Sequence, residues 1–411
     1  MSSMTYRDFD IETIRAEFPI LQRQINGKPL VYLDNAASAQ KPEAVISAMA
    51  DQARTAYANV HRGLHTLANE TTDRYEQARK SVQTFLNAPS EKNIVFTKGA
   101  TEGINIVAAG LAETIQPGDE IILSVMEHHS NIIPWHFLRE RCGAVLKWIE
   151  LTEEGGLDMA ALEAAIGPKT RLIALSHMSN VLGTVNDVKK ITALARAAGV
   201  LTLIDGCQAV VHLDLDMIDL DCDFYVFSGH KLYGPTGIGV LYGQTEALEA
   251  LRPFQGGGEM IETVSREAVT YNELPYRLEA GTPPILEAIG LGAAIDWFST
   301  FKLKDIQAHE DALYAHAREG VSAINGLKIY GETADKGPVM SFSLIGAHPH
   351  DISQIADKYG VALRAGHHCA QPLMSYMEVS ATARASFGIY NTHKEVDNFI
   401  EALEKACKML V

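Results

Sequence analysis

Long apolar runs are missing from this chain of 411 residues. No stretch approaches the roughly 20 consecutive apolar residues that a membrane-spanning helix needs, so we expect no membrane partner. The first segment, MSSMTYRDFDIETIRAEF, is charged and has no apolar centre, and we therefore expect no signal peptide. Together these absences predict a cytoplasmic protein.

Basic residues and cysteines are also scarce. The chain has 35 Lys and Arg against 51 Asp and Glu, which gives a formal net charge of -16. Such a chain repels phosphate groups, so we expect no nucleic acid partner. It has only 5 cysteines, and none of them form a C-x-x-C pair. That pattern is typical of reduced thiols rather than disulfides or structural zinc, and we expect no metal site.

Two short apolar runs near the middle of the chain end in polar residues. Residues 201–204 stop at Asp205, and residues 224–227 stop at a Ser-Gly-His-Lys sequence. Runs without alternation are typical of strands that are buried on both faces of a parallel sheet. Ligands bind outside the carboxyl ends of such strands. We therefore expect one crevice to be faced by Asp205, Gln208, Ser228, His230 and Lys231.

A lysine and a carboxylate at adjacent strand ends are the pair that pyridoxal 5'-phosphate requires. A lysine amine forms a Schiff base with an aldehyde cofactor, and a carboxylate pairs with a protonated pyridine nitrogen so that the ring remains an electron sink. Taken alone, Asp205 would be a helix cap and Lys231 an exposed lysine. Their matched positions, with Ser-Gly-His before the lysine, favour pyridoxal phosphate as the cofactor.

The pattern D-x-x-Q followed by S-G-H-K-x-x-G-P resembles the fold-type I pyridoxal-phosphate enzymes of aminotransferase class V. A later stretch, RAGHHCAQP from Arg364 to Pro372, is similar to the SufS-type, or group II, cysteine desulfurases of that class. The similarity covers nearly the whole chain, from Tyr32 to Gly388. Such motifs, in one order over this length, are very specific.

The resemblance implies an α/β fold with two domains. Residues 26–298 are expected to form a large cofactor-binding domain around a mainly parallel seven-stranded sheet. Residues 1–25 and 299–411 are expected to form a smaller α+β domain that carries the cysteine loop. The alternation of strands and helices between residues 94 and 242 agrees with the parallel sheet, whereas the number of strands comes from the family alone.

Several further residues are expected to hold the cofactor. The strand at 94–96 leads through a glycine turn into a helix start, which is a ready anion site. We expect Thr101 and backbone amides to bind the phosphate there, although relatives often carry threonine where this chain has Ala100. The resemblance implies that His128 covers the cofactor ring and that Asn180 contacts a ring oxygen and the substrate carboxylate. It also implies that Thr282 reaches the phosphate of a neighbouring subunit, which predicts a homodimer.

Cys369 is the candidate nucleophile. A thiol attacks as its thiolate, which nearby cationic groups favour, and Arg364 with His367 and His368 are candidates for that charge. The other cysteines are read as small buried hydrophobes, whereas glycine, two histidines and a proline around Cys369 describe an exposed loop. The resemblance assigns Arg384 to the substrate carboxylate, a task that suits a planar, two-pronged cation.

The function implied is cysteine desulfuration. L-cysteine is converted to L-alanine, a persulfide stays on Cys369, and the sulfur supplies Fe-S cluster assembly through an acceptor protein of SufE or SufU type. Lys231 is expected to move the α-proton, and His128 to protonate the leaving group. Three alternatives stay open: a selenocysteine lyase, a class V aminotransferase or lyase that does not use Cys369, and a non-catalytic scaffold for sulfur transfer.

Overall fold

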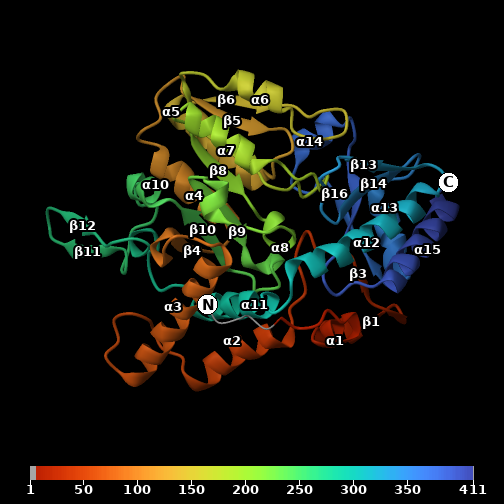
Figure 1. Cartoon of the computed structure of the whole chain (residues 1–411), viewed down its shortest axis with the longest axis horizontal. Helices are drawn as coiled ribbons and strands as arrows, with labels where there is room; N and C mark the ends of the chain where they lie inside the picture. The colour runs from red at the N-terminus through yellow and green to blue at the C-terminus, as the bar shows by residue number, and fades with distance from the viewer. Residues whose placement is uncertain (1–5, 411) are drawn as a thin grey trace.

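A seven-stranded sheet forms the centre of the computed structural model, which describes residues 6–410 (Figure 1). Residues 1–5, on which part of the signal-peptide prediction rests, lie outside this description. The strands in spatial order are β4 (Ile94–Thr97), β10 (Gly239–Gly243), β9 (Phe224–Ser228), β8 (Leu201–Asp205), β7 (Thr170–Ser176), β5 (Glu120–Ser124) and β6 (Val145–Ile149). Only β10 runs antiparallel to its neighbours. The prediction of an α/β fold with a mainly parallel seven-stranded sheet is therefore confirmed.

Helices cover both faces of this sheet. The cluster on one face includes α4 (Ala100–Leu111) and α5 (Ile133–Cys142), and the clusters on the other include α3 (Thr66–Phe85), α7 (Val188–Ala197) and α11 (Ile285–Phe298). Strand β9 shows why its apolar run lacks alternation. Its residues 224 and 226 pack in the first cluster, and residues 225 and 227 pack in the second. Both faces of the strand are thus buried.

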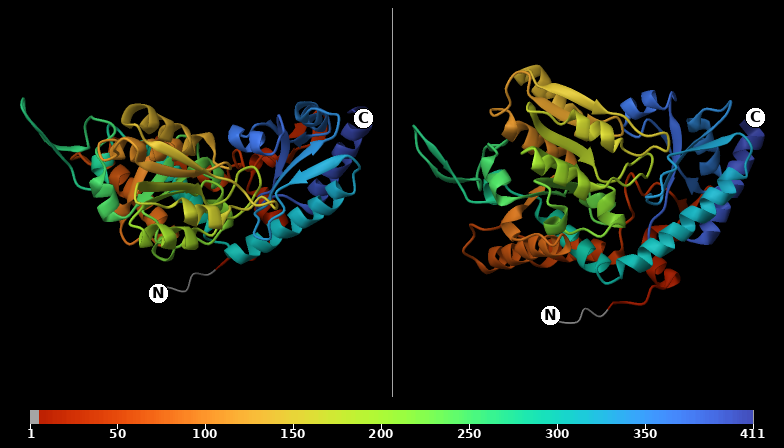
Figure 2. Two further views of the ribbon diagram at one scale, coloured as in Figure 1. Left: turned by 90° about the horizontal axis from the view of Figure 1, so that it is seen from above. Right: turned by 45° about the horizontal axis from the view of Figure 1, so that its top comes forward.

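A second sheet of four antiparallel strands lies beside the first (Figure 2). Its order is β13 (Leu327–Tyr330), β14 (Val339–Leu344), β17 (Thr382–Ser386) and β16 (Arg364–Gly366). Helices α12 (Leu303–Ser322), α13 (Pro349–Lys358) and α15 (His393–Leu410) pack around it. The long α12 runs from the region of the large sheet to the smaller one (Figure 2). The domain boundaries at residues 26 and 298 stay predictions.

The N-terminal part of the chain also pairs with the C-terminal part. Strand β3 (Val31–Tyr32) runs parallel to β15 (Val361–Ala362), beside the four-stranded sheet. A hairpin of β11 (Ile261–Val264) and β12 (Val269–Tyr271) projects from the body of the molecule (Figures 1 and 2). The remaining elements are α1 (Ile11–Ala16), β1 (Gln24–Ile25), β2 (Lys28–Pro29), α2 (Glu43–Thr55), α6 (Met159–Ala165), α8 (Ala209–His212), α9 (Met217–Leu220), α10 (Thr245–Ala250) and α14 (Gln371–Tyr376).

Short 3₁₀ turns complete the fold, and two of them, η3 (His129–Asn131) and η4 (Gly229–Lys231), follow strands of the large sheet. Between residues 6 and 410, no helix has both the length and the apolar composition that crossing a bilayer would require.

Candidate active site

A cavity of about 270 Å³ opens where the parallel strands of the large sheet end. Twelve residues predicted from the sequence line it together: Ala100, Thr101, His128, Asn180, Asp205, Gln208, Ser228, His230, Lys231, Arg364, Cys369 and Arg384. They come from both sheets, since Arg364 and Arg384 lie in β16 and β17. The crevice expected at the strand ends is thus present, and the cysteine loop closes one side of it.

The ends of β8 and β9 place the central polar groups. Asp205 is the last residue of β8, is 6% exposed, and its Oδ1 accepts a hydrogen bond from the Cys207 N–H at 3.0 Å. Ser228 is the last residue of β9, and its Oγ accepts from the Ala100 N–H at 2.9 Å. Since Ala100 begins α4, this bond fixes the helix start against the end of the strand.

The start of α4 is a cluster of donors. Gly99 has φ of +151°, and a Cβ there would lie 3.3 Å from Ser228 Oγ, so a side chain at this position would be strained and crowded. Thr101 Oγ1 lies 2.6 Å from Ser130 Oγ. The hydroxyls of Thr101, Ser130 and Ser228 therefore gather beside the positive end of a helix, a setting that suits a phosphate group.

Two histidines of the cavity are held in their neutral form. Burial, together with the charge of Lys231, lowers the pKa of His128 and of His230 to about 4 each. A neutral imidazole can stack on an aromatic ring without charge repulsion. Before His128 can act as an acid, it must first take up a proton. Gln208, which also lines the cavity, contacts the loop after β3, since its Nε2 donates to the Ala36 carbonyl at 2.8 Å.

Cys369 is exposed and its loop has an unusual backbone. His368 and Cys369 both have positive φ values, 52° and 56°, which non-glycine residues adopt only at a cost. Asn180 supports this loop, because its Nδ2 donates to the His368 carbonyl at 2.8 Å. The suggestion that His368 adds positive charge beside the thiol is wrong. Its ring is buried, and burial with the nearby Arg384 lowers the pKa of His368 far below its usual value.

The two arginines share a carboxylate that the sequence analysis left without a role. Asp34 accepts from Arg364 Nε at 3.0 Å and lies 3.4 Å from Arg384 Nη2. Arg384 also donates Nη1–H to the Asn180 carbonyl at 2.8 Å. Burial lowers the pKa of Arg384 to about 10, and within residues 6–410 its Nε has no hydrogen-bond partner. A buried guanidinium with a free N–H is suited to bind an anion.

Besides His367 in the cysteine loop, Thr282 is the predicted site residue that this cavity does not include. It lines a separate cavity of about 80 Å³ beside the end of β4, together with Lys98 and Glu102. Glu279, three residues before it, is buried and pairs with the buried Arg79 at 2.6 Å. The loop that carries Thr282 is thus anchored at its start, away from the other predicted residues.

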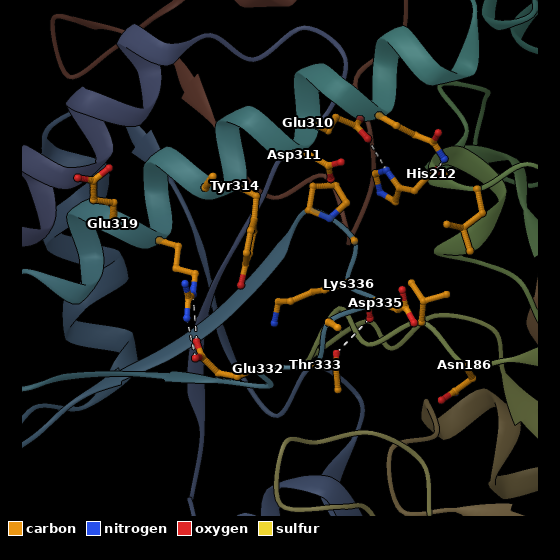
Figure 3. A pocket seen from close by; sticks show the side chains of 18 of the residues that line it. Asn186, His212, Glu310, Asp311, Tyr314, Glu319, Glu332, Thr333, Asp335 and Lys336 are labelled. Carbon is orange, nitrogen blue, oxygen red and sulfur yellow. Dashed lines mark hydrogen bonds and ion pairs between the residues drawn. The ribbon is translucent and has the colours of Figure 1, made fainter. Parts of the chain in front are cut away.

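Another cavity, about 1320 Å³, lies between α12 and the loop at 331–338 (Figure 3). His212 Nδ1 and Glu310 Oε2 are 2.8 Å apart at its edge and join α8 to α12. Among the described residues, Lys336 donates to the backbone carbonyls of Leu182, Tyr330 and Gly331. Neither Lys231 nor Cys369 lines this space, which is separate from the cavity at the ends of the parallel strands.

The site also has polar residues that were not predicted from the sequence, among them Asp34, Glu127, His129, Ser130 and Ser176. Glu127 is fully buried and accepts from Asn131 Nδ2 at 2.7 Å and Ser124 Oγ at 2.6 Å. Their position in the sequence was the available signal, because residues 127–130 come shortly after the end of β5 and Asp205 is itself the last residue of β8. Asp34 follows β3, a short strand that belongs to neither of the two larger sheets. Its place after a strand therefore did not indicate that it lies at the site.

Comparison with known proteins agrees with this geometry. The family model described as Aminotransferase class-V matches residues 31–399. The chain therefore belongs to the class-V aminotransferase family. Within it, the chain is 50% identical to a cysteine desulfurase of Serratia proteamaculans over 98% of this chain and 99% of the relative. It is 47% identical to a probable cysteine desulfurase of Halalkalibacterium halodurans, over 95% of this chain and 97% of the relative.

Solved structures give the same result. The cysteine desulfurase CsdA from Escherichia coli matches with a TM-score of 0.92 and 42% identity, covering 98% of this chain and 100% of that one. A cysteine desulfurase from Thermococcus onnurineus also has a TM-score of 0.92, with 37% identity and full coverage of both chains. The fold, the cavity and these relatives place the chain among the cysteine desulfurases.

Pyridoxal 5'-phosphate, the cofactor of this family, fits the residues present. Asp205 is a buried carboxylate for which residues 6–410 provide no cationic side chain within ion-pair distance. A protonated ring nitrogen would supply the missing charge. The amine of Lys231 opens onto the same cavity, and the hydroxyls at the start of α4 are donors for a phosphate. The donor set therefore agrees with the cofactor that the sequence predicts.

Proposed function

We propose that this protein removes sulfur from L-cysteine, releases L-alanine and keeps the sulfur as a persulfide on Cys369. The observation that carries the proposal is the meeting of an exposed thiol with Lys231, Asp205 and Arg384 around one cavity. An aminotransferase needs the lysine, the carboxylate and the arginine, but it has no use for a thiol on a loop that is held against the site. A scaffold protein would need none of the four.

Each residue has a task that its surroundings support. Pyridoxal phosphate, when bound, supplies the electron sink that makes the α-proton of the amino acid acidic. Arg384 binds the substrate carboxylate, with Asn180 next to it and Arg364 adding positive charge. The amine of Lys231 accepts the α-proton, and Asp205 holds the positive charge of the ring nitrogen. Thr101, Ser228, His230 and Gln208 position the cofactor, and His128 covers its ring.

Sulfur transfer is assigned to Cys369. Its thiolate attacks the sulfur of the substrate, and the new S–S bond forms as the C–S bond of the substrate breaks. The electron pair of the C–S bond stays with the three-carbon fragment, which takes up one proton at its β-carbon, regains the α-proton from Lys231 and leaves as alanine. His128, neutral at rest, carries protons between the substrate and solvent in this scheme.

We also propose an oligomeric state, a sulfur acceptor and a cellular location for the protein. Thr282 lies outside the cavity of its own chain, which supports a homodimer in which it reaches the partner's phosphate. We propose that a SufE- or SufU-type protein takes the persulfide sulfur from the exposed loop, that the sulfur serves Fe-S cluster assembly, and that the protein acts in the cytoplasm. The large domain of 26–298 and the small domain of 1–25 and 299–411 are retained as the proposed division of the chain.

The test is to incubate the purified holoenzyme with L-cysteine and a reductant, and to measure sulfide and alanine together. Equal amounts of both are expected. Cys369→Ala should bind pyridoxal phosphate normally, form almost no alanine and carry no persulfide by mass spectrometry, whereas Cys407→Ala in α15 should behave as wild type. Normal alanine formation by Cys369→Ala would move the assignment to an enzyme that does not use the thiol. A large preference for L-selenocysteine would move it to a selenocysteine lyase.

A further inference from the structure

The loop that carries Cys369 is held in place from several sides. Two consecutive non-glycine residues in the left-handed region persist only when surrounding contacts fix them. One of these contacts is the bond from Asn180 to the His368 carbonyl. Another joins the buried His368 Nε2 to Thr382, 2.9 Å from its Oγ1, in the neighbouring strand. Both lie before the cysteine in the chain, so neither fixes the segment that follows it.

His129 holds the cysteine itself and the segment after it. Its backbone N–H donates to the Cys369 carbonyl at 2.7 Å. Its ring Nε2 lies 3.1 Å from the backbone nitrogen of Gln371 and accepts that N–H. One residue of the turn η3 therefore binds the peptide groups on both sides of Ala370, and α14 begins at Gln371. No other side chain among the described residues is bonded to that amide.

The bond to Gln371 requires a neutral imidazole, because a protonated Nε2 has no lone pair to accept an N–H. Partial burial, with the charge of His367 nearby, lowers the pKa of His129 and keeps the ring in this form. The other titratable groups close to it are His128, whose ring centroid is 6.4 Å away, and Cys369 itself. The acceptor is thus available at neutral pH.

The turn that carries His129 is fixed without its ring. Glu127 binds Asn131 at 2.7 Å, and Asn131 Oδ1 in turn accepts from Trp135 Nε1 at 3.1 Å. These side chains are buried beneath the turn. Removal of the His129 ring should therefore leave η3 in place and free only the cysteine loop.

We propose that His129 is a positioning residue that latches the Cys369 loop against the cavity, so that the thiol stays within reach of the substrate sulfur. This inference rests on the proposed function and adds to it a residue that does not touch the substrate. It assigns different roles to two adjacent histidines: His128 covers the cofactor ring, and His129 positions the nucleophile.

The experiment compares His129→Ala with His129→Gln in the holoenzyme. Glutamine places a neutral oxygen near the position of Nε2 and can accept the Gln371 N–H without being protonated. His136→Ala is the matched control, because His136 lies seven residues further on, in α5, and packs beside Trp148. Three quantities are measured for each protein: hydrogen exchange of the peptide that covers residues 366–374, the rate of alanine formation, and the change of the cofactor spectrum on adding L-cysteine.

In His129→Ala, hydrogen exchange at Gln371 should speed up and kcat for alanine should fall, each by roughly tenfold, as expected for the loss of one hydrogen bond. The spectral change and the cysteine concentration for half-saturation should stay as in wild type. In His129→Gln, both the exchange rate at Gln371 and kcat should return most of the way to the wild-type values. In His136→Ala, neither quantity should change. Wild-type exchange in His129→Ala, or no rescue by glutamine, would overturn the latch. Loss of cofactor binding in His129→Ala would also overturn it.

The exchange measurement does not depend on the reaction. If wild type forms no alanine, the proposed function fails while the exchange results still test the latch. If wild type is active and His129→Ala matches it in both exchange and alanine formation, the latch fails and the proposed function stands.

Discussion

Arg364 and Arg384 lie directly opposite each other in the antiparallel strands β16 and β17, and both guanidinium groups contact the carboxylate of Asp34. Like charges in facing positions repel, and one carboxylate balances only one of the two. The edge of the cavity therefore keeps an excess of one positive charge where the buried Arg384 meets it. An amino-acid carboxylate is the natural counter-ion, and this arrangement makes the arginine pair the expected binding point for the substrate.

The first prediction concerns Arg384→Lys. Lysine keeps the charge but loses the planar fork, so the KM for L-cysteine should rise by roughly 10- to 100-fold, the worth of one or two charge-assisted hydrogen bonds. The visible spectrum of the bound cofactor should not change, because Asp205 and Lys231 are untouched. Steady-state alanine formation checks the first point and absorbance the second. An unchanged KM would mean that another group holds the carboxylate.

The second prediction concerns Lys231→Ala. The variant should lose the visible absorption band of the bound cofactor and all turnover, because no other described lysine lines the cavity. Borohydride reduction followed by peptide mapping should label Lys231 in wild type and nothing in the variant. Labelling of the variant at a second lysine would show that the Schiff base forms elsewhere.

The third prediction concerns Thr282→Ala and assembly. If Thr282 reaches the partner's phosphate, the variant should release pyridoxal phosphate several-fold faster on dialysis while its melting temperature in the apo form stays unchanged. Sedimentation should show a dimer for wild type and variant alike. A fully active monomer would contradict both the shared site and the role of Thr282.

The sequence predicted which residues meet in one crevice where those residues lie at or just after the ends of parallel strands. Asp205 and Lys231 follow buried strands of one parallel sheet, and parallel strands end at one edge, so their meeting follows from local pattern alone. Arg384 belongs to the second sheet and Cys369 to the loop that follows β16 of that sheet, and nothing local places that sheet beside the first. The resemblance to a family supplied that relationship, and the structure shows it in the bond from Asn180 to His368.

Other features could not be read from the chain because they depend on contacts over long distances in sequence. Asp34 comes to the arginines through long-range pairing, of β3 with β15 and of Asp34 itself with Ser386 in β17. His368 looked like a source of charge, and only its burial beside Arg384 shows that it is neutral. His128 and His129 are adjacent in the sequence, and only the position of the cysteine loop separates their contacts.

The last prediction concerns the buried carboxyl of Glu127. Burial raises its pKa from 4.5 to about 7, although the bonds from Ser124 and Asn131 oppose the shift. The folded protein therefore binds this proton more tightly than the unfolded chain does. The resulting stabilisation is complete below pH 4.5, falls as the pH rises toward 7, and is absent above that.

The substitution Glu127→Gln removes this dependence of stability on pH, because a glutamine side chain does not titrate. A glutamine can accept from Asn131 through its oxygen. Its nitrogen can donate to Ser124 Oγ, because a serine hydroxyl can rotate and accept instead of donating. Relative to wild type, the variant should gain roughly 3 kcal/mol of stability between pH 4.5 and pH 8, from the conversion of a pKa difference to free energy. Denaturant unfolding at pH 5 and pH 8, with pyridoxal phosphate in excess, measures it. Glu140→Gln, an exposed neighbour in α5, is the control and should follow the wild-type profile. If Glu127→Gln follows that profile too, the carboxyl is ionised in the folded protein and does not drive the pH dependence.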